Sequence, residues 1–290
     1  MNFFRHIENC NKNIQGEFIP WKTNNRTLGW ISKENIFVLK KFPNIFHINN
    51  TVRLKSENLD FKEISNLLAE VADYLAANKI IPQLMNELYP VTYGERKDAI
   101  AVIDRAATSF FGLRAFGQHL NGFVKISGEI HIWVAKRAYD RHIFPGALDN
   151  MVAGGLPYGI SLRDNLAKEC WEEAGMPDHI VETASPVGLV TYNKISKHGF
   201  RPDILYCYDI ELDPNFIPKN TDGEVESFNL IPVREIMEIV KNSDRFKTNC
   251  NLVVIDFLIR HGFISPSHEE YLSLCIGLRQ NIGNISNAQF

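Results

Sequence analysis

Three glutamates, Glu169, Glu172 and Glu173, lie close together in a stretch with helical character. Each residue of an α-helix advances about 100° around the axis, so these carboxylates share one face about 100° wide. Like charges on adjacent turns repel by about 0.2–0.5 kcal/mol per pair, and a divalent cation would reverse that sign. Because Mg²⁺ binds carboxylates, waters and substrate phosphates, the pattern indicates metal-assisted hydrolysis of a phosphate bond.

The helix that must position these acids is expected over residues 162–174. A Gly-rich turn that includes Gly154 and Gly155 precedes it, and Gly175 ends it. Residues that can pack into a core recur at every fourth position, namely Leu162, Leu166, Cys170 and Ala174. The alternative is a solvated acidic face with Lys168 as a local partner, but the glycines at both ends favour a functional site.

The segment from Gly154 to Met176 resembles the Nudix box, which runs Gly, five residues, Glu, seven residues, Arg-Glu-apolar-any-Glu-Glu-any-Gly-apolar. Two positions differ, because Ile160 stands where the first Glu is expected and Lys168 replaces the Arg. The resemblance implies that Glu169, Glu172 and Glu173 are catalytic and bind Mg²⁺ or Mn²⁺. The first Glu is mostly a supporting group in the family, so its replacement bears on loop anchoring more than on catalysis.

The resemblance extends beyond the box. Residues of about 100–265 are similar to the thiamine-pyrophosphokinase-related Nudix group. That group typically carries PG-x-LD-x-x-VAGG followed by G-I-S, which matches residues 145–155 and 159–161. It implies hydrolysis of thiamine diphosphate, or of its oxidised oxo and oxy forms, to the monophosphate. Other possibilities are a Nudix hydrolase of another nucleoside-diphosphate derivative, such as ADP-ribose or a dinucleotide, and a non-catalytic binding module. The intact acids argue against the module.

Two acids far from the box, Glu224 and Glu226, follow an Asp-Gly turn. Many Nudix enzymes place a distant loop Glu as an extra ligand or a general base. The resemblance thus implies Glu224 as a metal ligand and Glu226 as a catalytic group, although the sequence does not rank one above the other. An ordinary acidic turn is the alternative.

The candidate substrate-binding residues are Arg105, His119, Asn121, Arg137, Gly154, Gly155 and Arg201. Guanidinium groups pair well with phosphate oxygens. His119 and Asn121 lie near the expected domain junction, and pockets favour such junctions. Surface or structural roles are the alternative for the arginines, the histidine and the asparagine.

The fold class is α/β, with 290 residues arranged as two domains and a tail. We expect an N-terminal α+β domain over 1–118, a Nudix domain over 119–265, and a C-terminal helix and tail over 266–290. The resemblance implies an α/β/α sandwich around a mixed sheet. Strands are expected over 36–39, 51–54, 122–126, 129–135, 187–192, 204–212 and 224–231, and helices over 61–77, 99–110, 162–174, 233–241, 249–261 and 269–279.

The resemblance implies a small-molecule diphosphate as partner, and the composition bears on the other partner classes but leaves the oligomeric state open. The net charge of −3 does not suggest a nucleic-acid binder. The apolar run over 252–255 is far shorter than the ~20 residues of a membrane span, and the N-terminus lacks the apolar core of a signal peptide. A cytoplasmic protein is therefore expected. The five cysteines lack C-x-x-C spacing, which argues against disulfides and a structural zinc site.

Overall fold

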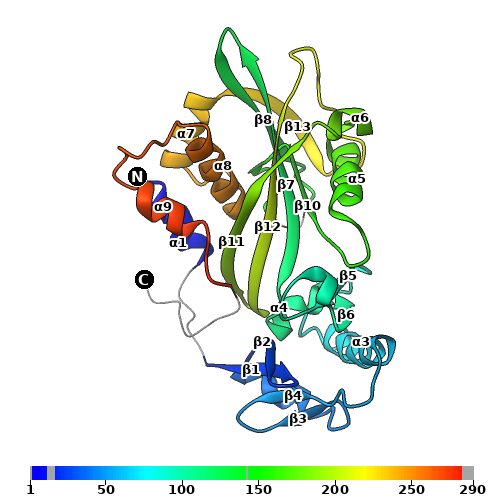
Figure 1. The fold of residues 1–290 in the computed structure, drawn as a ribbon. Coiled ribbons are helices and arrows are strands. Elements are labelled where there is room, and N and C mark those ends of the chain that lie inside the picture. Colours follow the sequence, from blue (N-terminus) through cyan, green and yellow to red (C-terminus); the bar gives the residue numbers. More distant parts are fainter. Residues whose placement is uncertain (1, 12–16, 142, 283–290) are drawn as a thin grey trace.

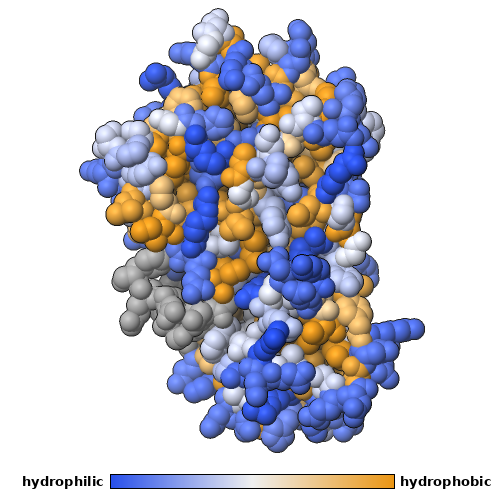
Figure 2. Space-filling model, in the orientation of Figure 1, coloured by the Kyte–Doolittle hydropathy of each residue, from blue (hydrophilic) through white to orange (hydrophobic). Residues whose placement is uncertain are grey.

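The computed structural model of the protein describes residues 2–11, 17–141 and 143–282. The expected tail therefore lies outside the described residues from 283 onward. Long curved strands run the length of the upper part, and a smaller α+β part lies at its lower end (Figure 1). On the face seen in Figure 2, hydrophobic residues form separated patches among hydrophilic ones.

A seven-stranded mixed sheet forms the centre of the upper part. Its main path is β11 (Ser185–Ser196), β12 (Gly199–Glu211), β7 (Ala115–Ile126), β8 (Glu129–Arg137) and β13 (Val225–Pro232). Two short strands extend it, β10 (Val152–Gly155) beside β7 and β9 (Leu148–Asp149) beside β8. β12 runs parallel to β7, and the other pairs are antiparallel. The β7–β8 turn is Ser127-Gly128, both with positive φ, as a tight hairpin requires.

Helices cover both faces of this sheet and make it an α/β/α sandwich (Figure 1). One side carries α5 (Leu162–Ala174) and α6 (Asp178–Val181). The other side carries α1 (Phe4–Cys10), α7 (Val233–Asn242), α8 (Thr248–Arg260) and α9 (Tyr271–Gly277). A separate apolar core fills the space under each layer. The expected fold class is confirmed.

The smaller part has its own core between a four-stranded sheet and one long helix. The sheet order is β2 (Arg26–Ser32), β1 (Phe18–Thr23), β4 (Val52–Leu54) and β3 (Phe46–Ile48). Helix α3 (Phe61–Ala77) packs on the hairpin of β5 (Leu88–Val91) and β6 (Ala101–Asp104). Three 3-10 turns, Lys33–Asn35, Arg96–Asp98 and Arg105–Ala107, and the short helices α2 (Ile36–Leu39) and α4 (Thr108–Phe111) complete it.

The expected helices over 61–77 and 162–174 are confirmed with the same bounds. The strand expected over 36–39 is wrong, because this four-residue apolar run forms α2, and so short a run carries no period. The helix expected over 99–110 is also wrong. Its first half is β6, whose four residues are all buried, so that neither helical nor strand periodicity is visible. Asp104 then caps the following turn by accepting from the Ala106 backbone NH at 2.8 Å.

The first helix of the chain packs with the last ones. Phe3 and Ile7 join the core beneath α8 and α9, and the Glu270 carboxylate accepts from the backbone NH groups of Phe3 and Phe4 at 3.1 and 2.9 Å. The boundary expected between residues 118 and 119 falls inside β7. Strand β7 therefore belongs wholly to the larger part, and so does α1, although both fall in the range expected for the N-terminal domain.

Two further sequence features have a structural counterpart. All five cysteines lie among the described residues and are free of disulfides, and four of them are buried. Among the described residues, none of the helices combines the length and apolar character needed to cross a membrane.

Candidate active site

Helix α5 is fixed at both ends by local interactions. The Ser161 hydroxyl accepts from the Asp164 backbone NH at 3.0 Å, which caps the first turn. Gly175 ends the helix with a φ of 60°, a left-handed conformation that favours glycine. Leu166, Cys170 and Ala174 lie in the core under the helix, so the acids are held on a rigid element.

Glu173 is the most buried of the three acids, with 7% of its surface exposed. Its Oε2 accepts from the Ala153 backbone NH of β10 at 2.8 Å. Burial raises the pKa of Glu173 to about 8, and the nearby Asp149 carboxylate adds to the shift. The ionised form is therefore costly unless a positive charge lies beside it.

Glu169 packs directly against the backbone of Gly154. A Cβ at position 154 would lie 2.2 Å from the carboxyl carbon of Glu169, so only glycine leaves room for this side chain. Burial raises the pKa of Glu169, and Lys168 opposes the shift. The Lys168 Nζ lies 3.2 Å from Glu169 Oε1 and 2.7 Å from Glu172 Oε2.

These contacts fit a hard divalent cation. Lys168 pairs with two of the acids, and the third is buried with a raised pKa that a bound cation would lower. Three carboxylates on one rigid helix face supply the oxygen ligands that Mg²⁺ and Mn²⁺ prefer. Glu169, Glu172 and Glu173 are therefore the residues that could hold the metal.

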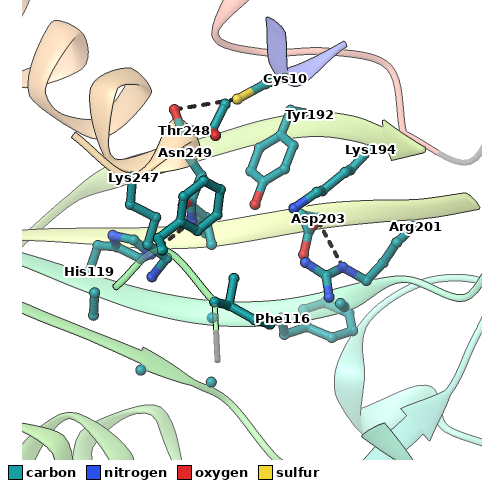
Figure 3. A pocket seen from close by; sticks show the side chains of 18 of the residues that line it. Cys10, Phe116, His119, Tyr192, Lys194, Arg201, Asp203, Lys247, Thr248 and Asn249 are labelled. Atoms are coloured by element: carbon teal, nitrogen blue, oxygen red, sulfur yellow. Dashed lines mark hydrogen bonds and ion pairs between the residues drawn. The ribbon is translucent and has the colours of Figure 1, made fainter. Parts of the chain in front are cut away.

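A cavity of about 360 Å³ lies where the two parts of the molecule meet (Figure 3). Its walls come from β7, β10, β11 and β12, from the ends of α1 and α8, and from Tyr89, Arg105 and Thr108 of the N-terminal part. Gly154 and Gly155 also line it. Because Gly154 contacts the Glu169 carboxylate, it lies between the cavity and the acidic helix.

The cavity walls carry an excess of positive charge. Five cationic residues line it, Arg105, Arg137, Lys194, Arg201 and Lys247, and three acids pair with four of them, namely Asp203 with Arg201, Glu87 with Arg105, and Asp149 with Arg137 and Lys247. Lys247 and His119 lie toward one end, and Lys194, Asp203 and Arg201 toward the other (Figure 3). Arg201 donates from Nε to Asp203 Oδ2 at 3.0 Å. The remaining positive charge suits a ligand with several negative charges.

Aromatic side chains line the same cavity. Phe116 comes from β7 and Tyr192 from β11. Tyr89 comes from β5, and Phe144 from the loop before β9. The Tyr192 side chain lies between the two charged ends (Figure 3). The cavity thus offers both apolar ring surface and cationic groups, as expected for a flat ring joined to phosphates.

Asp149, His119 and Cys250 form a buried cluster at the inner wall, with one potential ligand atom of each within 4.8 Å of the others. The Asp149 carboxylate, however, already accepts from Cys250 Sγ at 2.6 Å, and Arg137 and Lys247 lie 3.1 and 3.2 Å from it. Burial raises the pKa of the Cys250 thiol well above its usual range. Two cations and the thiol already pair with the carboxylate, so the cluster forms a buried hydrogen-bond and ion-pair network in this structure.

His119 should make the stability of the protein depend on pH. Burial, with Lys247 adding to it, lowers the His119 pKa from 6.5 to about 4. Between these values the unfolded state binds more protons, so the free energy of unfolding falls as the pH decreases. Between pH ~7.5 and ~5, the free energy of unfolding should fall by about 2 kcal/mol less in His119→Asn than in the wild type, measured by urea unfolding. The same change at exposed His47 is the control, and an equal loss in all three proteins would contradict the assignment.

The structure brings most of the expected substrate-binding residues together. Arg105, His119, Arg137, Gly154, Gly155 and Arg201 all line the cavity. Asn121 is different, because it is buried in β7 and away from the lining. Its Nδ2 donates to Asp209 Oδ1 at 3.0 Å, and its Oδ1 accepts from Asn150 Nδ2 at 2.9 Å. Those contacts give Asn121 a structural role.

The two distant acids lie at the start of β13. Glu224 pairs with Arg141 at 2.8 Å. Glu226 is exposed and lies at the register shift between Val225 and Ser227. Neither lines the cavity, so their roles in metal binding and catalysis stay predictions.

Several lining residues were not found from the sequence, among them Tyr89, Phe116, Tyr192, Lys194, Asp203 and Lys247. They come from β5, β7, β11, β12 and the start of α8, and no short motif joins them. The strand expected over 187–192 ends at Tyr192, whereas β11 continues to Ser196, and alternate residues of a strand share one face, which places Lys194 beside Tyr192.

Comparison with known proteins agrees with the geometry of α5 and β10. Residues 122–250 match the NUDIX domain, and residues 2–115 match a domain of unknown function, DUF4743. The chain is 41% identical over 289 residues to Nudix hydrolase 20 (chloroplastic) of Arabidopsis thaliana, covering 96% of this chain and 77% of that protein. It belongs to the Nudix hydrolase family.

This Nudix hydrolase is also similar to a second curated relative and to a solved structure. Nudix hydrolase 24 (chloroplastic) of Arabidopsis thaliana is 40% identical over 286 residues, again covering 96% of this chain and 77% of the relative. The crystal structure of DR0079 from Deinococcus radiodurans superposes with a TM-score of 0.42 at 18% identity, covering 59% of this chain and 96% of that one. The sequence relatives establish a hydrolase, and the N-terminal part matches a domain without an assigned function.

Proposed function

We propose that this Nudix hydrolase cleaves, with Mg²⁺ or Mn²⁺, a diphosphate linkage in a thiamine-diphosphate-type compound to give the monophosphate and phosphate. The observation that carries the proposal is the cavity in which Gly154 joins the acidic helix to a cationic, aromatic-lined space. The diphosphate would lie at the glycine side, and the rings would lie among the aromatic side chains.

Glu169, Glu172 and Glu173 would hold the metal, which when bound polarises the phosphoryl group and lowers the pKa of the attacking water. Gly154 and Gly155 let the chain approach the phosphates without a side chain between them. Arg105 and Arg201 offer guanidinium groups to phosphate oxygens. These groups orient the diphosphate and offset its negative charge.

The charge of the cavity favours one form of the substrate. The thiazolium ring of thiamine is cationic, whereas the corresponding ring of the oxo form is neutral. Five cationic residues outnumber the three acids that pair with them, and the remaining positive charge disfavours a cationic ring in the ligand. We therefore expect the oxo diphosphate to be a better substrate than thiamine diphosphate itself.

A substrate panel tests the function. Products are separated and quantified with Mg²⁺ or Mn²⁺. Thiamine diphosphate and its oxo and oxy forms would give the monophosphate and phosphate, whereas ADP-ribose and a dinucleotide would each give two organic phosphates. Highest kcat/KM for the oxo form supports the proposal. Higher kcat/KM for ADP-ribose or the dinucleotide supports the nucleoside-diphosphate alternative and overturns the proposed substrate. No hydrolysis of any of them overturns the proposal.

The metal site has its own test. Crystals soaked in Mn²⁺ should give an anomalous difference peak beside Glu169, Glu172 and Glu173, because these acids share one face of α5. The peak should be absent in crystals of Glu173→Gln soaked at the same concentration. An anomalous peak at the Asp149 cluster, with none beside α5, would contradict the assignment.

A further inference from the structure

The loop over 156–161 connects β10 to the acidic helix and sets where that helix begins. It contains no acidic residue. Ile160, at the position where the family pattern has its first Glu, packs instead against a small apolar cluster that includes Phe116 and Leu156. No carboxylate of its own therefore holds this loop, and its backbone carbonyl oxygens and NH groups are open to contacts from elsewhere.

Arg96 of the N-terminal part makes those interactions. It begins the 3-10 turn Arg96–Asp98 between β5 and β6. Its Nη2 donates to the carbonyl oxygen of Pro157 and, at 3.0 Å, to that of Ile160. One guanidinium group thus links both ends of the loop, immediately before the Ser161 cap of α5.

Other contacts of the same hairpin surround the loop. The Tyr158 backbone NH donates to the Leu88 carbonyl oxygen at 2.7 Å. The Tyr158 ring stacks on Phe61 of α3, with ring centroids 5.4 Å apart. The loop is therefore held through Arg96, Leu88 and Phe61 of the N-terminal part.

The start of the loop is equally tight. A Cβ on Gly155 would lie 2.4 Å from the Tyr89 hydroxyl and 2.8 Å from Arg105 Nη1. Arg105 in turn pairs with Glu87 at 2.7 Å. The N-terminal part therefore packs against Gly155 at the end of β10 as well as against the loop.

We infer that the N-terminal part, which matches a domain of unknown function, is a clamp that positions the acidic helix, and that Arg96 is its positioning residue. The clamp fixes the loop, the loop fixes the first turn of α5, and Gly154 fixes the Glu169 carboxylate. Arginine suits this task because its planar fork presents several donors in a fixed geometry, which an ammonium group does not. The kinetic consequence, although not the contact itself, rests on the proposed function.

Arg96→Met in the full-length chain tests the clamp, because it keeps an apolar stem and removes the donors. Three quantities are measured: hydrogen exchange of the backbone amides over 156–161, Mn²⁺ affinity by calorimetry, and kcat and KM. Supporting residues of metal sites typically change affinity or activity by 10–100-fold. We expect about 10-fold faster loop exchange, about 10-fold weaker Mn²⁺ binding and a similar loss of kcat, with KM changed less.

Arg163→Met is the matched control, because Arg163 is an exposed arginine on α5 that pairs with Glu182. We expect it to leave all three quantities near wild type. Arg96→Lys keeps the charge and should bring loop exchange, Mn²⁺ affinity and kcat part of the way back to wild type. If Arg96→Met does not fold, Arg96→Lys takes its place in every comparison.

Two results would overturn the inference. Wild-type exchange over 156–161 would show that Arg96 does not hold the loop. Faster exchange with wild-type Mn²⁺ affinity would show that the loop does not position the acids. If the substrate panel shows no hydrolysis, the proposed function fails, whereas exchange and Mn²⁺ affinity still decide the clamp.

Discussion

Glu173→Gln is expected to reduce kcat by about 100-fold or more, equivalent to about 2.7 kcal/mol of transition-state stabilisation. The substitution keeps the size of the side chain and can still accept from the Ala153 backbone NH, but it removes the charge that would bind the metal. Turnover is measured at saturating Mg²⁺ with the best substrate of the panel. Wild-type turnover under those conditions would show that this acid is not a working ligand.

The same variant should be more stable than the wild type when metal is removed. The folded-state pKa of Glu173, about 8, lies above the unfolded value of 4.5, so the wild type loses stability as the pH rises from about 4.5 to 8. Glu173→Gln lacks this loss. We expect it to exceed the wild type by at least about 2 kcal/mol in chelator at pH ~8.5, measured by urea unfolding.

Opposite changes in activity and metal-free stability separate a functional acid from a structural one. A structural glutamate would lose stability on substitution, because its hydrogen bond would weaken. Exposed Glu182, which pairs with Arg163 on the surface, is the control. Its change to Gln should alter neither quantity, since exposed ion pairs contribute little.

Gly154→Ala is expected to cost about 100-fold in kcat while leaving the fold intact. The new Cβ would lie 2.2 Å from the Glu169 carboxyl carbon, which must move away. Its nearest contacts are all atoms of this one side chain rather than backbone, so the strain is relieved by displacing Glu169. Activity should therefore fall together with Mn²⁺ affinity, whereas the unfolding midpoint changes little.

Gly94→Ala provides the comparison, because a Cβ there meets only Asp98 Oδ2 at 3.8 Å. This variant should keep wild-type kcat and Mn²⁺ affinity. If Gly154→Ala keeps them as well, Glu169 does not need its observed position. If Gly154→Ala unfolds the protein, the strain is not relieved at the side chain, and the fold rather than the Glu169 carboxylate requires a glycine at this position.

Elements with strong local patterns could be predicted from the sequence. Helix α3 has an apolar stripe and a capping box of Asp60 and Glu63, and α5 has a cap, a stripe and a closing glycine. Both were predicted with their observed bounds. The hairpin of β7 and β8 followed from alternation around Ser127-Gly128. In each case the interactions that define the element lie within a few residues of one another.

Short or fully buried elements could not be predicted in this way. The apolar residues of α2 and β6 lack a readable period, because the surroundings, rather than the local sequence, decide between helix and strand. The strands β1 and β2 of the N-terminal part were not predicted either. Their pairing with each other and with β4 joins residues that the sequence does not mark as partners.

The sequence by itself determined the acidic helix, the two glycines before it and the family to which they belong, because all of these lie within one continuous segment, whereas the turn expected at Gly154 and Gly155 is the end of strand β10. Only the tertiary structure decided how Arg105, Arg201 and Lys247 converge on one cavity and how Arg96 reaches the loop over 156–161. Those residues are separated by tens of positions in the chain. Their proximity depends on strand order and on packing between the two parts, which local spacing does not encode.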